Sequence, residues 1–376
     1  MFTIALFIFI TDIPLAQLSE LNTRCLWILR DSITSPEKID SAMTYAYKTG
    51  FNKVFIQVRG RGYAFYNSKI VPQNPLLSQD NFDPLAYILQ LGKIFDIEVH
   101  IWFNTYILWS SRFEPTDPNH LYHTKKDWTE ANVYGKMDWK MDLNAPRAPQ
   151  WEGIYLAPTH PEVNVYLRSV IQEILENYNI DGIHFDYIRY QDDIYGYNIK
   201  GRETFENIYT IDPINISKGI ISTRFGWTQE FVDSINIGWI RFRQDAITDL
   251  IRMVWEDIIT QNKDIQLSAA VKPNLPMAKE RYFQNWEYWL ESGLLDFVVP
   301  MNYYASTSNF NRDIQLMKIN LSDEDLENVV MGIATYNQDA QSAADKILIT
   351  RLNGFSGISL FSYDAHKNNL DWFLPL

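Results

Sequence analysis

Eight short apolar runs alternate with helical stretches along most of this 376-residue chain. Each run is almost continuously hydrophobic, as strands are when both faces of a parallel sheet are covered. The stretches between them have the length and apolar periodicity of amphipathic helices. The predicted strands are Cys25–Leu29, Lys53–Val58, Glu98–Phe103, Gly182–Asp186, Gln266–Val271, Phe297–Met301, Val329–Ile333 and Ile358–Phe361. The predicted helices are Ser35–Thr49, Pro84–Phe95, Pro161–Tyr178, Thr228–Gln261, Asn285–Ser292 and Ala340–Leu352.

This alternation predicts parallel strands joined by right-handed crossovers, and eight such units close naturally into a (β/α)8 barrel. An open doubly wound sheet is the alternative, but no strand is followed by the glycine-rich turn that binds nucleotide phosphates. We therefore predict an α/β fold, a single TIM barrel over residues 21–376. The long connections Thr105–Glu162 and Gln191–Thr228 follow strands three and four, where insertions would build the walls of a cleft.

The first 20 residues differ from the rest of the chain. The apolar run Phe2–Ile10 is too short to span a bilayer, and its length fits the centre of a secretory leader. We expect residues 1–20 to be a signal peptide or a disordered leader. The mature protein is then expected to be secreted, periplasmic or in the cell envelope, without a stable membrane span.

Composition excludes several classes of function. With 33 Lys and Arg against 46 Asp and Glu, the net charge is −13, which argues against a nucleic-acid partner. Cys25 is the single cysteine, so an intramolecular disulfide and a multi-cysteine zinc site are excluded. The six histidines lack the spacing of a dedicated metal site. We predict no metal and no cofactor.

Polar and aromatic side chains stand where the predicted strands end, which is the catalytic face of a barrel. One such residue alone has an ordinary explanation, because strand ends meet solvent. Together, amides, guanidiniums, tyrosines and tryptophans are the groups that grip sugar hydroxyls and stack on pyranose rings. The candidate substrate-binding residues are Gln57, Arg59, Trp102, Asn104, His184, Arg189, Lys272, Asn302, Tyr303 and Tyr363.

The fourth strand carries the most specific signal. Alternation places His184 and Asp186 on one face, so Asp186 is expected at the barrel mouth with Arg189 beside it. The alternative is a buried Asp–Arg pair that supports a loop. Glycoside cleavage needs two carboxyl roles, and we predict Asp186 as the main catalytic carboxylate. The second carboxyl group stays open. Its candidates are Asp31 and Asp364, followed by loop acids such as Asp142 and Glu152.

Four tryptophans lie in the connection after the third strand, in a chain whose aromatic content is 15%. Indoles in a loop need either a satellite core or a ligand, and a sugar ring is a suitable ligand. We predict that one of the four lies in a sugar subsite. They are Trp109, Trp128, Trp139 and Trp151.

The segments around strands two to six resemble the glycoside-hydrolase-10-like family, a bacterial family of (β/α)8 glycosidases. The resemblance covers nearly all of residues 24–363 and implies a secreted or envelope glycosidase. One branch of the family cuts peptidoglycan strands that have been stripped of their peptides. In the family a proline usually follows the fourth-strand motif, where this chain has Gln191. The matching segments are Phe51–Gly62, Glu98–Asn104, Asp181–Tyr190, Leu267–Val271 and Asp296–Tyr303.

A more distant likeness is to chitinase-type barrels, whose fourth strand reads Asp-Gly-x-Asp-x-Asp-x-Glu. Here His184 replaces one acid and Ile188 replaces the glutamic acid that protonates the leaving group. The likeness implies that Asp186 corresponds to the aspartate that orients a substrate N-acetyl group. Substrate assistance is therefore one mechanism to consider beside a carboxylate pair.

Three functional hypotheses follow. The first is a glycoside hydrolase acting on a cell-wall or extracellular polysaccharide, with peptide-free peptidoglycan or another amino-sugar glycan as candidate substrates. The second is a catalytically silent carbohydrate-binding barrel, because no second carboxylate is evident. The third is a barrel isomerase or aldolase that forms a Schiff base on Lys272, which would need a lowered lysine pKa.

Overall fold

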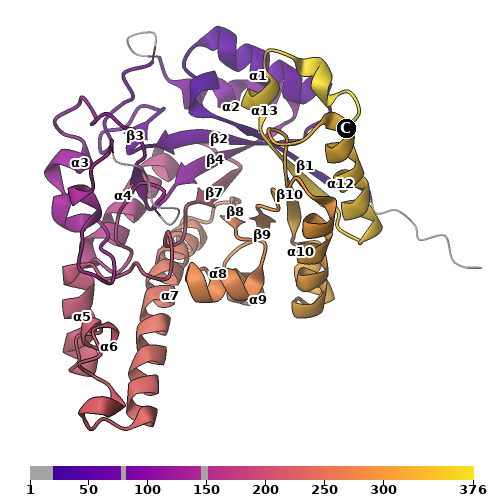
Figure 1. Ribbon diagram of the computed structural model, residues 1–376. Helices are drawn as coiled ribbons and strands as arrows, with labels where there is room; N and C mark the ends of the chain where they lie inside the picture. The colour runs from indigo at the N-terminus through magenta and orange to yellow at the C-terminus, as the bar shows by residue number, and fades with distance from the viewer. Residues whose placement is uncertain (1–19, 78–81, 145–150) are drawn as a thin grey trace, which may run out of the picture.

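The protein is described from a computed structural model that covers residues 20–77, 82–144 and 151–376. Residues 1–19, which hold nearly all of the expected leader, lie outside the described residues. Eight parallel strands follow one another around a nearly closed barrel in the order β10-β11-β1-β2-β4-β7-β8-β9 (Figure 1). They are β1 (Thr23–Ile28), β2 (Lys53–Gly60), β4 (Glu98–Asn104), β7 (Gly182–Asp186), β8 (Gln266–Val271), β9 (Phe297–Pro300), β10 (Val330–Ala334) and β11 (Gly357–Phe361).

The barrel closes between β9 and β10. These strands are joined by two isolated bridges, Val298 to Val329 and Met301 to Gly332, in place of a continuous ladder. The other seven junctions are parallel ladders. The predicted TIM barrel is confirmed, and each predicted strand lies within two residues of an observed one.

Helices cover the outside of the barrel, as Figure 1 shows. The six predicted helices all form, with ends within one residue of prediction. They are α1 (Pro36–Lys48), α2 (Pro84–Phe95), α4 (Pro161–Asn177), α7 (Gln229–Thr260), α9 (Trp286–Glu291) and α12 (Ala340–Leu352). Additional helices of the described chain are α3 (Leu121–Thr124), α5 (Ile199–Tyr209), α6 (Ile214–Ser217), α8 (Leu275–Arg281), α10 (Thr307–Asn320), α11 (Asp323–Glu327) and α13 (Tyr363–His366).

Side-chain alternation divides the strands between two environments. One face packs in the main hydrophobic core with the helices, and residues such as Ile56, Ile101 and Phe185 lie there. The opposite face fills the barrel with a second, aromatic cluster that includes Trp27 and Trp102. Burial on both faces explains why the strands read as continuous apolar runs.

Both long connections carry structure of their own. The connection after β4 forms a two-stranded sheet, β5 (Ile107–Trp109) with β6 (Ile154–Tyr155). The connection after β7 forms α5 and α6, which lie beside the first half of α7 and extend away from the barrel (Figure 1). A short strand, β3 (Tyr63–Ala64), pairs antiparallel with the end of β2. None of the described helices combines the length and apolarity required to cross a bilayer.

Candidate active site

A cavity of about 490 Å³ opens where the barrel strands end. Besides the candidate Glu152, six of the predicted site residues line it, from β2, β4, β7 and the segments after β7 and β9. They are Gln57, Trp102, Asn104, Asp186, Arg189 and Tyr303. The cavity therefore lies at the carboxyl ends of the strands, where barrel enzymes carry their catalytic groups. Other residues that line it include Trp27, Arg30, Arg61, Glu152, Tyr187, Tyr336 and Phe361.

Asp186 lines this cavity from the last position of β7, and only 6% of its surface is exposed. The Trp102 indole donates to its Oδ2 at 3.0 Å, and the backbone N–H of Tyr187 donates to its Oδ1 at 2.7 Å. Its carbonyl accepts from Thr105 N at 2.8 Å, which ties the end of β7 to the connection after β4. These contacts fix the orientation of the carboxyl group.

Glu152 supplies a second carboxyl group to the same cavity. It precedes β6 in the long connection after β4, and 34% of its side chain is exposed. The Arg189 guanidinium forms an ion pair with it, with Nη1 at 3.0 Å from Oε2 and Nη2 at 3.2 Å from Oε1. The Tyr155 hydroxyl also donates to this carboxylate. Glu152 is thus held as an anion by a fork of donors.

The two carboxyl groups differ in acidity. Burial raises the pKa of Asp186 to about 6, although Arg189 and the hydrogen bonds oppose the shift. Burial also acts to raise the pKa of Glu152, but Arg189 and Lys272 outweigh it and hold that pKa below its ordinary value. A pair with separated pKa values can hold one proton over the mildly acidic range.

Lys272 lines an adjoining cavity of about 240 Å³ that shares Met301 and Tyr303 with the first. Its ammonium lies 4.5 Å from the centre of the Tyr282 ring. Repulsion from Arg189, together with burial, lowers the pKa of Lys272 to about 7. The shared residues make the two cavities neighbours, as two subsites for a chain of sugars would be.

Tyr303 offers an unused hydrogen-bonding group at this junction. Its ring stacks on Phe361 at a centroid distance of 5.5 Å. Its hydroxyl is buried and has no hydrogen-bond partner within the described ranges. A buried polar atom without a partner costs free energy unless a ligand or water satisfies it, so this hydroxyl is suited to bind a substrate.

A second layer of contacts positions Glu152. Gln191 accepts the backbone N–H of Glu152 at 3.1 Å through its Oε1, and its amide N–H donates to Asp138 Oδ2 at 2.7 Å. Asp138 also accepts Tyr155 N at 3.0 Å. A residue without a side-chain amide at position 191 could not make these bonds.

Arg59 is among the predicted binding residues that do not line either cavity. The register between β2 and β4 shifts between Gln57 and Arg59, which marks a bulge. The bulge places Arg59 opposite Phe103, where its guanidinium lies 5.0 Å from that ring. There it donates to the carbonyls of Asn104 and Thr105. Its observed contacts therefore support the β4 turn.

Asn302 and His184 are also buried in structural positions. Asn302 donates to the Phe310 carbonyl at 3.0 Å, on the helix side of β9. His184 lies inside the barrel, stacked on Phe55 at 4.0 Å between ring centroids, with Ser268 Oγ 2.8 Å from Nδ1. Burial holds the pKa of His184 well below its ordinary value. Neither residue lines the described cavities.

The remaining sequence candidates lie around β1 and α13. Asp31 is exposed and is not among the described residues that line the cavities. Asp364 accepts Leu29 N at 2.7 Å and Ser32 Oγ at 2.5 Å, so it joins the end of β1 to α13. Tyr363 is buried against Tyr45 at 5.7 Å between ring centroids. The structure thus brings neither aspartate to Asp186.

The cavity is also lined by Arg30, Arg61 and Glu152, which were not leading candidates from the sequence. Arg30 donates to Gln57 Oε1 at 3.1 Å, and Arg61 to Ser110 Oγ at 3.1 Å. Both arginines directly follow strand ends, which was an available signal. Glu152 lies 34 residues before Asp186, in a connection without periodic pattern, so its position depended on the fold of that connection.

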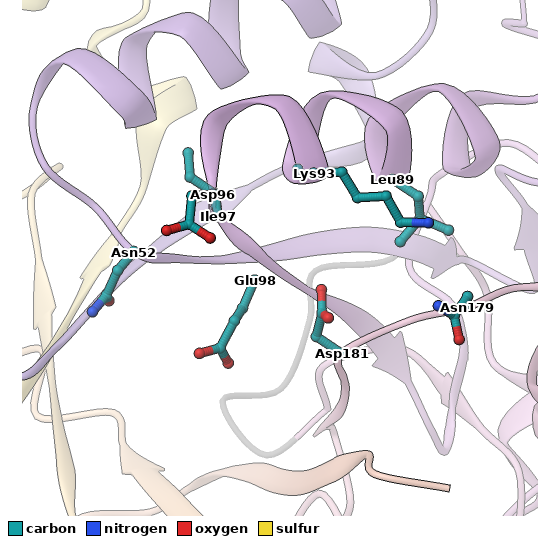
Figure 2. Close-up of a pocket in the computed structure, with 9 residues that line it drawn as sticks. Asn52, Leu89, Lys93, Asp96, Ile97, Glu98, Asn179 and Asp181 are labelled. Atoms are coloured by element: carbon teal, nitrogen blue, oxygen red, sulfur yellow. The ribbon is translucent and has the colours of Figure 1, made fainter.

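A different pocket lies at the opposite end of the barrel and is shown in Figure 2. It lies where β2, β4 and β7 begin, and its volume is about 350 Å³. Its acids already serve the sheet, since Asp181 accepts Val99 N at 2.7 Å and Glu98 pairs with Lys53 at 2.5 Å. The amino-terminal face of a barrel generally contributes stability, so we do not assign the active site there.

Within the described residues, no group of three His, Cys, Asp or Glu side chains is arranged to hold a metal ion.

Known proteins that resemble this chain are named as glycosyl hydrolases. Glycosyl hydrolase DigH of Escherichia coli strain K12 is 23% identical over 344 residues, which cover 88% of this chain and 67% of that protein. Glycosyl hydrolase YngK of Bacillus subtilis strain 168 is 22% identical over 271 residues, covering 69% of this chain and 47% of that protein.

Solved structures share the fold. The glycoside hydrolase domain of PgaB (BpsB) from Bordetella bronchiseptica matches with a TM-score of 0.67 at 15% identity, covering 93% of this chain and 96% of that one. Alpha-L-fucosidase isoenzyme 2 from Paenibacillus thiaminolyticus matches with a TM-score of 0.60 at 11% identity, covering 90% and 46%.

The family described as Glycosyl hydrolase-like 10 matches residues 22–347, which is most of the chain. The protein is a glycosidase and belongs to the Glycosyl hydrolase-like 10 family.

Proposed function

We propose that this glycosidase hydrolyses a cell-wall or other extracellular polysaccharide, with Asp186 and Glu152 as its catalytic carboxyl pair. The observation that carries the proposal is that both carboxyl groups line one cavity at the carboxyl ends of the strands. Glycoside hydrolysis needs two such groups flanking the scissile bond. The second carboxyl group favours catalysis over the silent binding protein considered from sequence.

The pKa difference assigns the two roles. Asp186, whose pKa is raised to about 6, is the proton donor to the leaving oxygen. Glu152 stays ionised beside Arg189 and stabilises positive charge at the anomeric carbon, directly or by activating water. The glycosidic C–O bond breaks as the leaving oxygen takes the Asp186 proton. Water forms the new C–O bond at the anomeric carbon, the proton that it loses passes to a carboxylate of the pair, and exchange with solvent restores the Asp186 acid. This assignment replaces the nucleophilic or acetamido-orienting role expected from sequence.

The surrounding residues would hold the sugar. Trp27, Trp102 and Phe361 give the cavity an aromatic base, and Tyr303 presents a free hydroxyl at its junction with the second cavity. Aromatic faces with a few placed polar groups are typical of carbohydrate sites. Two adjoining cavities fit at least two sugar units of a longer strand, for which peptide-free peptidoglycan and other amino-sugar polymers are the candidates. An envelope or extracellular location follows from such a substrate.

Lys272 is the residue that would carry the alternative chemistry, a Schiff base of an isomerase or aldolase. A lysine pKa near 7 is a property of Schiff-base lysines, and Lys272 meets that condition. The largest cause of this lowered pKa, however, is repulsion from Arg189, the same arginine that pairs with Glu152. We therefore propose that Lys272 contributes positive charge and a hydrogen bond to a neighbouring sugar.

The test is a panel of amino-sugar polymers that includes peptide-free peptidoglycan strands, chitin oligosaccharides and chitosan. Mass analysis should find products that have gained one water per cleavage, and Glu152→Gln should release far fewer of them. Binding without any release of reducing ends across the panel would instead establish the silent binding protein. Borohydride trapping of a substrate on Lys272 would establish the aldolase class.

A further inference from the structure

A further pocket, of about 500 Å³, lies in the connection after β4. Its walls come from α3, from the turns around Lys126 and Trp139, and from the start of α5. None of its described lining residues belongs to the Asp186 cavity or to the adjoining Lys272 cavity. It is therefore a separate feature of the molecule.

Trp139 gives this pocket an aromatic wall. Of the four tryptophans in the connection, Trp109, Trp128 and Trp151 are buried in the hydrophobic core, whereas Trp139 is half-buried and lines the pocket. Met137 and the half-exposed Ile199 extend its apolar surface. An accessible indole beside aliphatic side chains is a surface on which the apolar face of a pyranose ring stacks.

Lysines surround that indole. The ammonium of Lys126 lies 5.2 Å from the centre of the Trp139 ring, and that of Lys140 lies 5.3 Å from it. Lys126 and Lys200 both line the pocket, but Lys200 is paired with Glu203 at 2.8 Å, so Lys126 is the lining lysine that offers its charge to a ligand. In the part of the chain that the structure describes, no carboxylate forms an ion pair with Lys126 or Lys140.

The acids of this segment do not neutralise its lysines. Residues 121–140 contain four lysines and three carboxyl groups, those of Asp127, Glu130 and Asp138. Glu130 and Asp138 are buried, and burial raises the pKa of each to about 8, so both are mostly uncharged near neutral pH. Asp127 remains, and it also lines the pocket. Although the chain has a net charge of −13, Lys126 and Lys140 thus place positive charge on both sides of the Trp139 indole.

We propose that this pocket is a second carbohydrate-binding site that holds a carboxylate-bearing polysaccharide strand. A sugar ring stacks on Trp139, and Lys126 binds its carboxylate, with the charge of Lys140 beside the same indole. Charge complementarity selects an acidic glycan over a neutral one, because the lysine ammonium groups beside the indole attract anions. The inference deepens the proposed function by naming an acidic class of polymer, and it rests on that function only for the choice of a glycan.

The test measures binding of hexa-galacturonate to the full chain by calorimetry. An uncharged chitin hexasaccharide is measured in the same way for comparison. Trp139→Ala should weaken binding of hexa-galacturonate about tenfold or more. Lys126→Gln should weaken it less, and added salt should weaken binding to the wild-type chain. Trp227→Ala, which alters a partly exposed tryptophan at the start of the α7 region, should leave binding unchanged.

Three results would overturn the proposal: no binding of hexa-galacturonate to the wild-type chain, unchanged binding by Trp139→Ala, or equal affinity for the uncharged hexasaccharide. Binding lost through Asp186→Asn would place the ligand in the first cavity and would also overturn it. Melting temperatures confirm that each variant is folded. The catalytic proposal is judged separately, because Trp139→Ala should hydrolyse a short soluble substrate at the wild-type rate.

Discussion

The Arg189 guanidinium lies 3.0 Å from the Glu152 carboxylate, a contact between residues 37 positions apart in the sequence. It joins the connection after β4 to the turn after β7, and both residues line the same cavity as Asp186. The ion pair therefore does two things at once: it fixes the second carboxyl group in the cavity, and it keeps that group ionised while burial favours the protonated form of Asp186.

Glu152→Gln should lower kcat by about 10²- to 10⁴-fold, the range for loss of a catalytic acid or base. Glutamine keeps an acceptor for the Tyr155 hydroxyl but leaves the buried Arg189 without its ion-pair partner, so the melting temperature should fall and the rates are compared at a temperature where both variants are folded. The measurement is steady-state hydrolysis of the substrate found in the polymer panel. Glu114→Gln, an exposed glutamate in the same connection, is the matched control. Equal rates for the two variants would remove Glu152 from the catalytic pair.

Activity should fall as the pH rises through about 6. Asp186 must carry a proton to protonate the leaving oxygen, and its raised pKa keeps that proton only up to about this value. On the acid side, activity should fall when Glu152 takes up a proton, at a pH below the ordinary glutamate pKa. The profile of kcat/KM reports both groups. A rate that instead rises through pH 6 would show that Asp186 works as an anion.

Gln191→Ala should lower kcat by about ten- to a hundredfold with little change in KM, because a small displacement of a catalytic group is costly. The variant removes the link between the Glu152 backbone and Asp138, at 3.1 Å and 2.7 Å. A purely structural role would lower the melting temperature and leave kcat of the folded fraction intact. Gln244→Ala, a buried glutamine that bonds the Lys279 carbonyl on another helix, controls for loss of a buried amide.

Gly182→Ala should destabilise the barrel by about 1–3 kcal/mol, the usual cost of overpacking a core. A Cβ atom at this position would stand 2.1 Å from His100 Nδ1, inside the barrel where the buried ring has little room to move. Urea denaturation measures the loss. A midpoint equal to that of the wild-type protein would mean that the barrel interior relaxes around the extra methyl group.

The sequence predicts most of this fold, because continuous apolar runs and helical periodicity are local properties. It also places Asp186 correctly on the inner face of β7, since alternation along a regular strand is simple to follow. Arg59 shows the limit. The bulge after Gln57 reverses the expected face, and the alternating pattern contains no sign of it.

Glu152 shows a second limit. It is one of several acids in a connection of more than 50 residues, and its contacts with Arg189, Tyr155 and Gln191 distinguish it from Asp142. Those contacts depend on how two connections meet in space. Asp364 illustrates the converse, because its place after a strand suggested catalysis while its hydrogen bonds to Leu29 and Ser32 serve the chain itself.

The central claim is that Asp186 performs the chemistry, and the most direct test is the hydrolysis rate of Asp186→Asn beside that of Asp31→Asn. The account predicts that Asp186→Asn abolishes hydrolysis while its melting temperature stays close to that of the wild-type protein. Asp31→Asn, which changes an exposed carboxylate outside the cavity, should keep the wild-type rate. Full activity in a folded Asp186→Asn variant would contradict the account.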